Sequence, residues 1–423
     1  MARAQSGPSV GRMLLYSAGS IGAGAFYAFN NFVLPPILKG LGASDLLIGL
    51  LASTRSIEGV VIQPTVGAVS DRIWTPFGRR RPFIAIAVPL SAAFFVASSS
   101  IHSLVPLAIM VFLFSLFFNV AVDPYTALVG DIAPLDRRGV LNGVATCVQL
   151  ASQVAFLLIV VAASVGGELP SWTYLGVAFL MVASFAITVI GVPEPAERTE
   201  LVERIPIREY VAALWTHRTA MTYLGTLFVY QFGLNAIQPY LVLFVMQDIH
   251  QPDEVGFALA ALLMLVTAAS AIAFGKVADR VGTRPILIVG WTLLGVGATG
   301  GALVATLPQT ITALVVAGIG NGAATAVAWP LLTALIPSDK TGVFAGLKAA
   351  SESIAIPLSV VVAAELFLPR LGYRGIFVML AVTIVLALLL LVRLVKVPMP
   401  AQQAPVSKTY VKAEDAPATS LRR

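Results

Sequence analysis

Charged side chains are scarce in this 423-residue chain. Asp, Glu, Lys and Arg make up 11% of it, against roughly 25% in an ordinary soluble domain, and the mean hydropathy is +0.89. A water-soluble fold is therefore excluded. Backbone amides in hydrocarbon can be satisfied only within helices or closed barrels. The apolar runs are roughly 20 to 29 residues long without period-two alternation, which predicts an all-α integral membrane protein.

Cysteine and histidine are nearly absent as well. Cys147 is the single cysteine, which excludes an internal disulfide, a cysteine zinc site and an iron–sulfur cluster. His102, His217 and His250 lie in or near loops without metal-ligand spacing, and no glycine-rich phosphate cradle or ATP-binding domain accompanies the spans. We expect no metal, no cofactor, no enzyme activity and no ATP-driven pumping.

Long apolar segments dominate what is present, and they predict twelve transmembrane helices. The first segment is too long for the apolar core of a cleaved signal peptide, so we expect it to be retained. The segments cover residues 13–38, 46–69, 82–101, 104–132, 140–165, 171–192, 220–247, 255–277, 285–306, 309–336, 342–368 and 373–395.

One long charged connection divides these segments into two groups of six. The predicted organisation is a cytoplasmic N-terminal segment at 1–12, a six-helix bundle at 13–192, a cytoplasmic central loop at 193–219, a second bundle at 220–396 and a disordered cytoplasmic tail at 397–423.

The basic residues predict the orientation in the membrane. With both termini in the cytoplasm, of the 27 Lys and Arg only Lys39, Arg370 and Arg374 fall outside, while Arg55 and Lys348 lie within helices. Lys and Arg concentrate on the cytoplasmic side of membrane proteins. We therefore expect a multi-pass protein of the cell membrane with the bilayer as its partner, and the net charge of +6 needs no nucleic acid to explain it.

The two halves repeat each other. Gly67, Asp71 and Arg72 return as Gly275, Asp279 and Arg280, and Asn31 with Pro35 returns as Asn235 with Pro239, at offsets of about 205 residues. Each pair falls on the same side of the membrane, so the repeat is parallel. Two such bundles are the basis of rocking, alternating access.

Two motifs carry a family resemblance. They are Gly67-x-x-x-Asp71-Arg72-x-x-x-x-x-Gly78-Arg79-Arg80-Arg81-Pro82, and Pro124-Tyr125-x-Ala127-Leu128-x-x-Asp131-Ile132-x-Pro134 with Arg138-Gly139. The chain resembles the major facilitator superfamily, and within it the glycoside-pentoside-hexuronide:cation symporters and the sucrose–proton symporters. The first motif is expected to form a gating latch, although its charges could also serve only to set the topology. The expected gating residues are Gly67, Asp71, Arg72, Gly78, Arg79, Arg81, Asp279 and Arg280.

Five charged residues fall at membrane depth, where each costs about 3 kcal/mol unless it faces a cavity or a partner. They are Arg55, Glu58, Asp123, Lys348 and Glu352. Arg55 with Glu58 and Lys348 with Glu352 each share a helix face and could neutralise one another. Asp123 has no such neighbour in sequence.

The resemblance implies that Glu58, Asp123 and Lys348 line a central cavity and handle a coupling cation and a sugar. Arg55 departs from the family pattern, because a second carboxylate would be expected there. This favours a proton over sodium as the coupling ion. We expect Asp123 or Glu58 to bind the proton, and Asp131 is a rival site. The alternative is a fixed salt-bridge network that holds the halves together without any titration.

Amides and aromatic rings suit the hydroxyl groups and rings of sugars. Gln231, Asn235 and Gln238 form one stripe on the seventh helix, although hydrogen bonding between helices also explains isolated amides. The further candidates are Tyr27, Asn30, Asn31, Asn119, Tyr125, Gln149, Gln153 and Trp329. Pro239 and Pro330 would bend their helices.

These observations together predict a monomeric secondary transporter that carries a glucoside or other small saccharide together with a proton, by symport and alternating access. Two alternatives stay open. One is a proton-driven efflux antiporter for amphipathic compounds, and the other is a transport-inactive solute sensor.

Overall fold

The computed structural model describes residues 10–53, 65, 66, 70, 73, 75–133, 135–164, 170–194, 216–337 and 340–395. Nine helical stretches within this part of the chain are long and apolar enough to cross a membrane, and the last of them, Val343–Leu394, holds two spans. The seventh span is divided into two shorter helices, Arg218–Asn235 and Leu241–Gln247. Of the expected second span the structure describes 46–53, 65 and 66, so its full crossing stays a prediction. The predicted domain limits stay predictions, because 195–215 and 396–423 fall outside the described residues.

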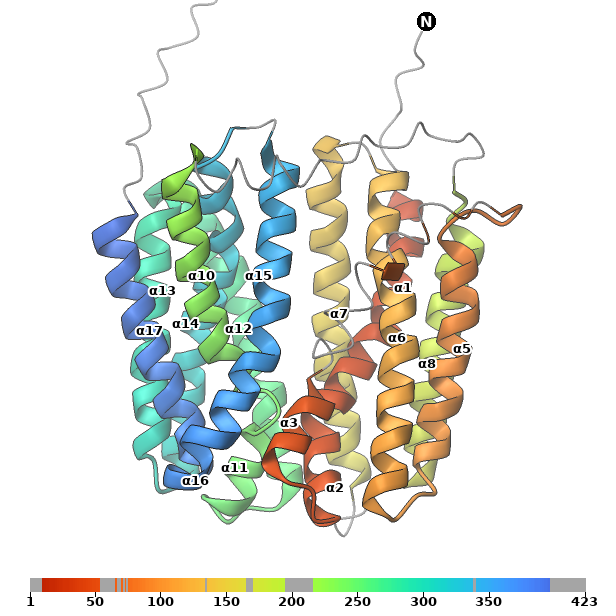
Figure 1. Ribbon diagram of the computed structural model, residues 1–423, viewed down its shortest axis with the longest axis horizontal. Helices are drawn as coiled ribbons and strands as arrows, with labels where there is room; N and C mark the ends of the chain where they lie inside the picture. The colour runs from red at the N-terminus through yellow and green to blue at the C-terminus, as the bar shows by residue number, and fades with distance from the viewer. Residues whose placement is uncertain are drawn as a thin grey trace, which may run out of the picture.

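The N-terminal bundle is built around its first helix, which packs against the fifth and sixth spans, while the third span packs against the fourth and the sixth (Figure 1). Its elements are α1 (Val10–Ala28), η1 (Phe29–Val33), α2 (Leu34–Gly40), α3 (Asp45–Ala52), α5 (Arg81–Ser98), α6 (Leu104–Ile132), α7 (Leu135–Ala163) and α8 (Ser171–Gly191).

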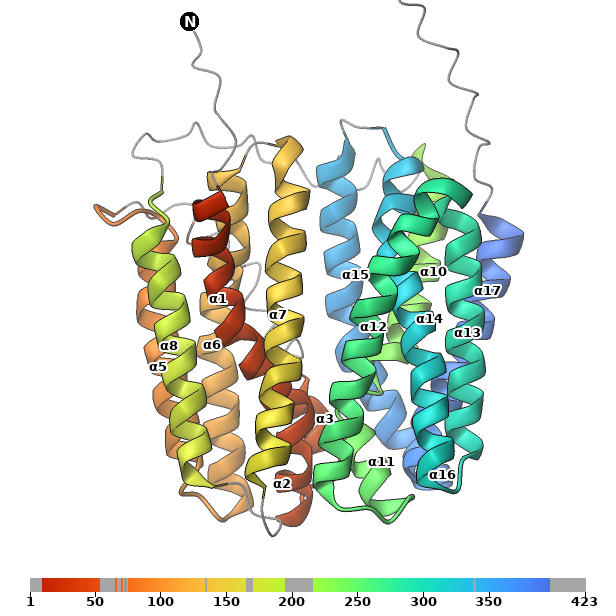
Figure 2. The ribbon, with the colours of Figure 1, turned by 180° about the vertical axis from the view of Figure 1, so that it is seen from behind.

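The C-terminal bundle stands beside it (Figure 2), and its chain begins and ends on the same side of the molecule as the N-terminal bundle begins. We call that side the terminal side and the opposite one the distal side. The elements are α10 (Arg218–Asn235), α11 (Leu241–Gln247), α12 (Asp253–Val281), α13 (Thr283–Leu303), α14 (Leu307–Ala334), α15 (Thr341–Val362), η3 (Ala363–Phe367), α16 (Leu368–Leu371), η4 (Gly372–Arg374) and α17 (Gly375–Leu394).

Small residues let α1 approach its neighbours closely. A Cβ atom at Gly24 would lie 2.4 Å from the carbonyl oxygen of Gln149, and one at Gly22 would lie 2.4 Å from Ser184 Oγ. Ser152 Oγ also donates to the carbonyl oxygen of Ile21 at 2.7 Å. Close backbone approach through glycine is the usual way in which membrane helices associate, and here it fixes α1 against α7 and α8.

Three spans are interrupted where the two bundles face each other. The first span contains the π-helical turn η1, α3 ends at Ala52 with Ser53 in an extended conformation, and α10 is separated from α11 by turns at 236–240 that include Pro239. Irregular backbone at membrane depth is tolerated where it lines a cavity or is buried in protein. Pro330, by contrast, lies within the continuous helix α14.

Candidate functional site

A cavity of about 350 Å³ lies between the bundles, at the interrupted spans. Both halves contribute to it, through α1, η1, α6 and α7 on one side and α10, the following turn, α12 and α15 on the other. Its polar lining residues are Tyr27, Asn31, Ser53, Tyr125, Thr126, Gln149, Gln153, Gln231, Asn235, Gln238 and Glu352.

The cavity gathers eight of the eleven residues expected to bind substrate. These are Tyr27, Asn31, Tyr125, Gln149, Gln153, Gln231, Asn235 and Gln238. That the three residues of the helix-7 stripe and the two glutamines of α7 reach one space follows from helical periodicity. Their role as sugar ligands stays a prediction.

Asn30, Asn119 and Trp329 are not among the lining residues. The Asn30 amide is fully buried and donates to the carbonyl oxygen of Ala52 at 2.7 Å, so it caps the end of α3. Asn119 Nδ2 donates to the carbonyl oxygen of Ser115 one turn back at 3.0 Å, and Trp329 packs against the hydrophobic core. Their substrate role also stays a prediction, but these positions do not favour it.

Glu352 is the one charged side chain among the described lining residues. Its Oε1 accepts hydrogen bonds from Lys348 Nζ at 2.5 Å and from Gln231 Nε2 at 2.9 Å. The Lys348 and Glu352 side chains are 25% and 19% exposed. Because lysine and carboxylate lie one helical turn apart on α15, they compensate each other, and the pair adds no net charge to the cavity wall.

A hydrogen bond between side chains of the two halves lies at the cavity. Asn31 Nδ2, in the π-helical turn of the first span, donates to Gln238 Oε1 in the turn after α10 at 3.0 Å. Asn235 Nδ2 is held by the carbonyl oxygen of Gln231 at 2.8 Å. The interruptions of spans 1 and 7 therefore bring amides from equivalent parts of the repeat into contact.

Tyr125 borders the cavity but its hydroxyl is already engaged. It donates to the carbonyl oxygen of Tyr16 at 2.9 Å, lies 2.8 Å from Ser20 Oγ, and its ring stacks on that of Tyr16 with centroids 4.7 Å apart. These contacts fix α6 to α1. Tyr125 is thus a wall of the cavity whose polar end already has partners.

Of the expected coupling residues, the structure brings Lys348 and Glu352 together. Asp123 on α6 is partly buried; it precedes the lining residue Thr126, whose Oγ1 donates to the Asp123 carbonyl oxygen at 3.0 Å, but it is not itself among the lining residues. Arg55 and Glu58 lie outside the described residues. Whether Asp123 meets the second span therefore stays a prediction.

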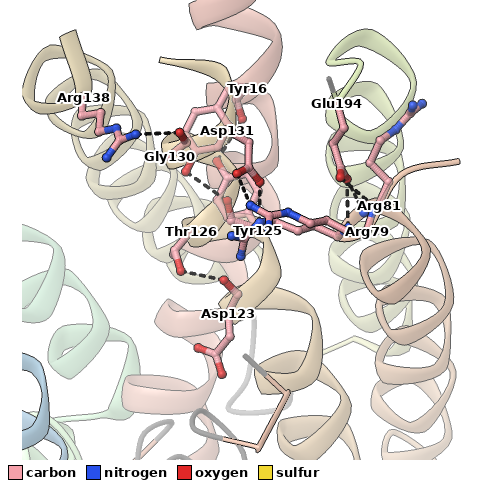
Figure 3. A network of polar contacts seen from close by, with 11 residues as sticks. Tyr16, Arg79, Arg81, Asp123, Tyr125, Thr126, Gly130, Asp131, Arg138 and Glu194 are labelled. Carbon is pink, nitrogen blue, oxygen red and sulfur yellow. Dashed lines mark hydrogen bonds and ion pairs between the residues drawn. The ribbon is translucent and has the colours of Figure 1, made fainter. Parts of the chain in front are cut away.

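Asp131 takes part in a network on the terminal side (Figure 3). It forms ion pairs with Arg79 and with Arg80, the latter with Arg80 Nε at 2.5 Å. Its side chain is 11% exposed. Asp131 is therefore ion-paired with the loop that leads into α5, and its part in proton coupling stays a prediction.

Glu194, which follows α8, completes this network. Its carboxylate accepts the backbone N–H groups of Arg79, Arg80 and Arg81 at 2.7, 3.0 and 2.8 Å. These groups lie at the start of α5, where helix N–H groups lack internal partners and the helix dipole favours an anion. Gly78, which has a φ of +107°, leaves space for the Glu194 carboxylate, because a Cβ atom at this position would lie 2.7 Å from Glu194 Cδ.

Glu194 belongs to the charged connection predicted between the two bundles and was not among the expected gating residues. Its position directly after a span, beside Pro193, is the signal that could have singled it out. Among the other expected gating residues, Gly67, Asp71 and Arg72 lie outside the described residues. Asp279 and Arg280 lie in the last turn of α12 and are exposed, and neither side chain has an ion pair within the described residues.

A second contact between the halves closes the distal side, and sequence reasoning missed it. Asp45, the first residue of α3, accepts the Tyr373 hydroxyl at Oδ1 at 2.6 Å and Lys39 Nζ at 2.8 Å. Its carbonyl oxygen accepts the Tyr240 hydroxyl at 2.8 Å. We call Lys39, Asp45, Tyr240 and Tyr373 the distal latch. α3 also contacts α15 and η3 there, and α2 contacts α11.

Comparison with known proteins supplies the family. The family model of the Major Facilitator Superfamily matches residues 16–233 and 223–422. A sucrose transport protein of Oryza sativa subsp. japonica is 38% identical over 78 residues, which cover 18% of this chain and only 14% of the rice protein. A multi-drug resistance efflux pump of Streptococcus pneumoniae is 24% identical over 272 residues, or 60% of this chain and 64% of the pump.

Solved structures agree on the fold. The crystal structure of a D-xylose-proton symporter superposes with a TM-score of 0.73 at 14% identity, covering 92% of this chain and 98% of the symporter. At that identity the likeness shows the arrangement of the helices alone. On these findings the chain belongs to the major facilitator superfamily.

Proposed function

We propose that the protein is a proton-coupled sugar symporter of the cell membrane that works as a monomer by alternating access, with its terminal side in the cytoplasm. One observation carries the proposal: the cavity between the bundles is lined by carboxamides, and its described carboxylate is compensated by a lysine.

Carboxamides fit a neutral ligand rich in hydroxyl groups. Each Asn or Gln side chain offers two N–H donors and a carbonyl acceptor, so it can meet a hydroxyl in either sense. Five glutamine or asparagine side chains besides Asn31 line the cavity, and Tyr27 adds an aromatic face. A sugar presents both hydroxyl groups and a ring, whereas an amphipathic cation needs an uncompensated acid and apolar walls.

The relatives support the same substrate class. The rice protein is described as a sucrose transporter and the xylose carrier as a proton symporter, but the first matches over a short segment and the second supports only the fold. The efflux pump matches over a longer stretch at lower identity. Proton-driven export of amphipathic compounds is therefore the second candidate.

Glu352 is our first choice for the proton-binding group. When it carries a proton it no longer balances Lys348, and the ammonium group is released to face the cavity or the substrate. The Glu352 carboxylate would then bind either the Lys348 ammonium group or a proton. Proton binding is thereby coupled to a movement of the Lys348 side chain on α15. Moving one charge through 100 mV supplies about 2.3 kcal/mol, which supports about fifty-fold accumulation of a neutral solute. Asp123 is the rival.

Proteoliposome uptake of a panel of labelled mono- and disaccharides, with and without an imposed pH gradient, tests the proposal. Wild type is expected to accumulate one of the sugars only with the gradient. Glu352→Gln should keep exchange of sugar across a gradient-free membrane but lose accumulation, because exchange needs no net proton movement. Asp123→Asn serves as the comparison.

The outcomes separate the candidates. Gradient-driven accumulation that survives in Glu352→Gln but disappears in Asp123→Asn would move the proton to Asp123. Loss of a lipophilic cation from the vesicles without any sugar flux would favour the efflux antiporter. Saturable sugar binding without flux of any kind would favour the sensor.

A further inference from the structure

We propose that an anionic phospholipid of the terminal-side leaflet binds between α5 and α8, with its acyl chain in an apolar groove and its phosphate at Arg81. The inference concerns the outer surface of the N-terminal bundle. It does not depend on which solute the central cavity takes.

The groove has a volume of about 230 Å³ and is lined by aliphatic and aromatic side chains of two neighbouring helices. Those that define its walls are Ile84, Val88 and Pro89 on α5 and Phe185, Val189 and Ile190 on α8. A groove of this kind on a membrane-spanning bundle suits a lipid chain. By itself it selects no head group.

Arg81 lies at the terminal end of the groove. It precedes Ile84 and Val88 by three and seven residues on α5, which places all three on one helix face. Long side chains on a helix point towards its N-terminus, which here is the terminal side. The guanidinium of Arg81 can therefore reach the head-group level while the residues below it line the groove.

The Arg81 side chain has no hydrogen-bond or ion-pair partner within the described part of the chain, and its Nε is buried. Its neighbours differ, because the guanidinium groups of Arg79 and Arg80 are paired with Asp131. Glu194 is engaged by three backbone N–H groups, that of Arg81 included. Figure 3 shows the Arg81 guanidinium on the far side of Glu194 from Asp131.

Charge counting points to an anion. Within the described residues this network holds three arginines and two carboxylates, one positive charge in excess, and the arginine without a side-chain partner among them is Arg81. A phosphodiester fits a guanidinium through two parallel hydrogen bonds. A phospholipid with net negative charge also compensates the leftover charge, which a zwitterionic lipid does not.

Phe77 adds an anchor beside this site. It lies in the Thr75–Gly78 turn and is 74% exposed, and the loop that leads into α5 projects sideways from the bundle on the terminal side (Figure 1). Exposed apolar rings at the edge of a bilayer enter the boundary between the head groups and the acyl chains. A lipid bound at Arg81 would thus hold the loop that carries Arg79 and Arg80, and would tune the terminal-side network.

The test compares retention of phosphatidylglycerol and phosphatidylcholine by the detergent-solubilised protein. Bound lipid is counted by native mass spectrometry, and the melting midpoint is followed during titration with each lipid. Wild type should retain phosphatidylglycerol about tenfold better than phosphatidylcholine, and Arg81→Gln should lose this preference. Ala186→Trp, which fills the groove and leaves Arg81 in place, should lose both lipids.

Arg284→Gln is the matched control. Arg284 precedes Pro285 at the start of α13 as Arg81 precedes Pro82 at the start of α5, and its Nε is likewise buried without a partner in the described residues. It differs in two ways: its Nη2 donates to the Val392 carbonyl oxygen at 3.5 Å, and α13 does not line the groove. It should behave as wild type.

Four results would overturn the proposal: equal retention of both lipids by wild type, an unchanged preference in Arg81→Gln, a loss in Arg284→Gln as large as in Arg81→Gln, or equal stabilisation by inorganic phosphate. Should Arg81→Gln fail to give a monodisperse protein, retention by Ala186→Trp decides, and wild-type retention in that variant rejects the site.

Discussion

Removal of a single hydroxyl group from the distal latch is expected to shift the balance between the two faces of the transporter. Tyr373 is 5% exposed, and its hydroxyl donates to Asp45 Oδ1 at 2.6 Å across the two halves. Tyr373→Phe deletes that bond. The aromatic ring keeps its contact with the Lys39 ammonium, 5.5 Å from the ring centroid.

The magnitude follows from the charge and exposure of the acceptor. A hydrogen bond to a charged group contributes about 1.5–3 kcal/mol. Here the carboxylate is 29% exposed and keeps its Lys39 partner, so we take about 1 kcal/mol, because solvent screens part of the interaction. Since 1.4 kcal/mol changes an equilibrium constant tenfold, the fraction of molecules that are open on the distal side should rise about fivefold in Tyr373→Phe.

Distances between spin labels measure this population. Labels at Ser103 and Ala305, which are exposed and lie in the distal loops before α6 and α14, report the separation of the two halves in a Cys147→Ser background. Tyr174→Phe is the control, because Tyr174 is a buried tyrosine of α8 within one bundle. An unchanged long-distance population in Tyr373→Phe, or an equal rise in Tyr174→Phe, would refute the assignment of the latch.

Three further changes test other parts of the structure. Gly78→Ala should lower the free energy of unfolding by about 1–3 kcal/mol and the melting midpoint with it, because φ of +107° strains an alanine and its Cβ meets the Glu194 carboxylate. Gln231→Ala should raise the KM of sugar uptake about tenfold by removing an amide of the cavity and a bond to Glu352. Asp248→Asn should raise the melting midpoint at pH 7 but not near pH 4. Burial raises the pKa of Asp248, so the folded state favours the protonated carboxyl group. The wild-type protein therefore loses stability as the pH rises through that pKa, and the asparagine variant does not.

Each of these changes has a counterpart elsewhere in the chain. Gly139→Ala places a methyl group where nothing lies within 4 Å, Gln247→Ala removes an exposed amide at the end of α11, and Asp279→Asn neutralises an exposed aspartate. None should reproduce its partner's effect. A melting midpoint for Gly78→Ala equal to that of Gly139→Ala, an unchanged KM in Gln231→Ala, or a pH-independent effect of Asp248→Asn would contradict the respective reasoning.

The sequence predicted which amide side chains line the cavity better than it predicted which side chains contact each other. Gln231, Asn235 and Gln238 form a stripe in the sequence because helical periodicity is local, and all three line the cavity. The pairing of Lys348 with Glu352 was also accessible, since the residues are four apart on one helix. For Asp123 the sequence offered no such neighbour, and the absence of a local partner does not say where a side chain points.

The polar contacts on the terminal side and in the distal latch join residues that are far apart in the chain. Glu194 and Arg79 are 115 residues apart, and Tyr373 and Asp45 are 328 apart. No periodicity links such residues. Asn30 shows the same limit, because its place in the sequence does not indicate that it lies in a π-helical turn and donates to the carbonyl oxygen of Ala52 at the end of α3.

The sequence by itself determined the membrane-spanning class, the number of spans and the parallel repeat, because burial in hydrocarbon is a property of local composition and length. Only the tertiary structure decided which charges meet. That depends on how closely α1 approaches its neighbours at Gly22 and Gly24 and on where spans 1, 2 and 7 break. A shift of one helical turn at any of these contacts would pair different side chains while leaving the hydropathy of the chain unchanged.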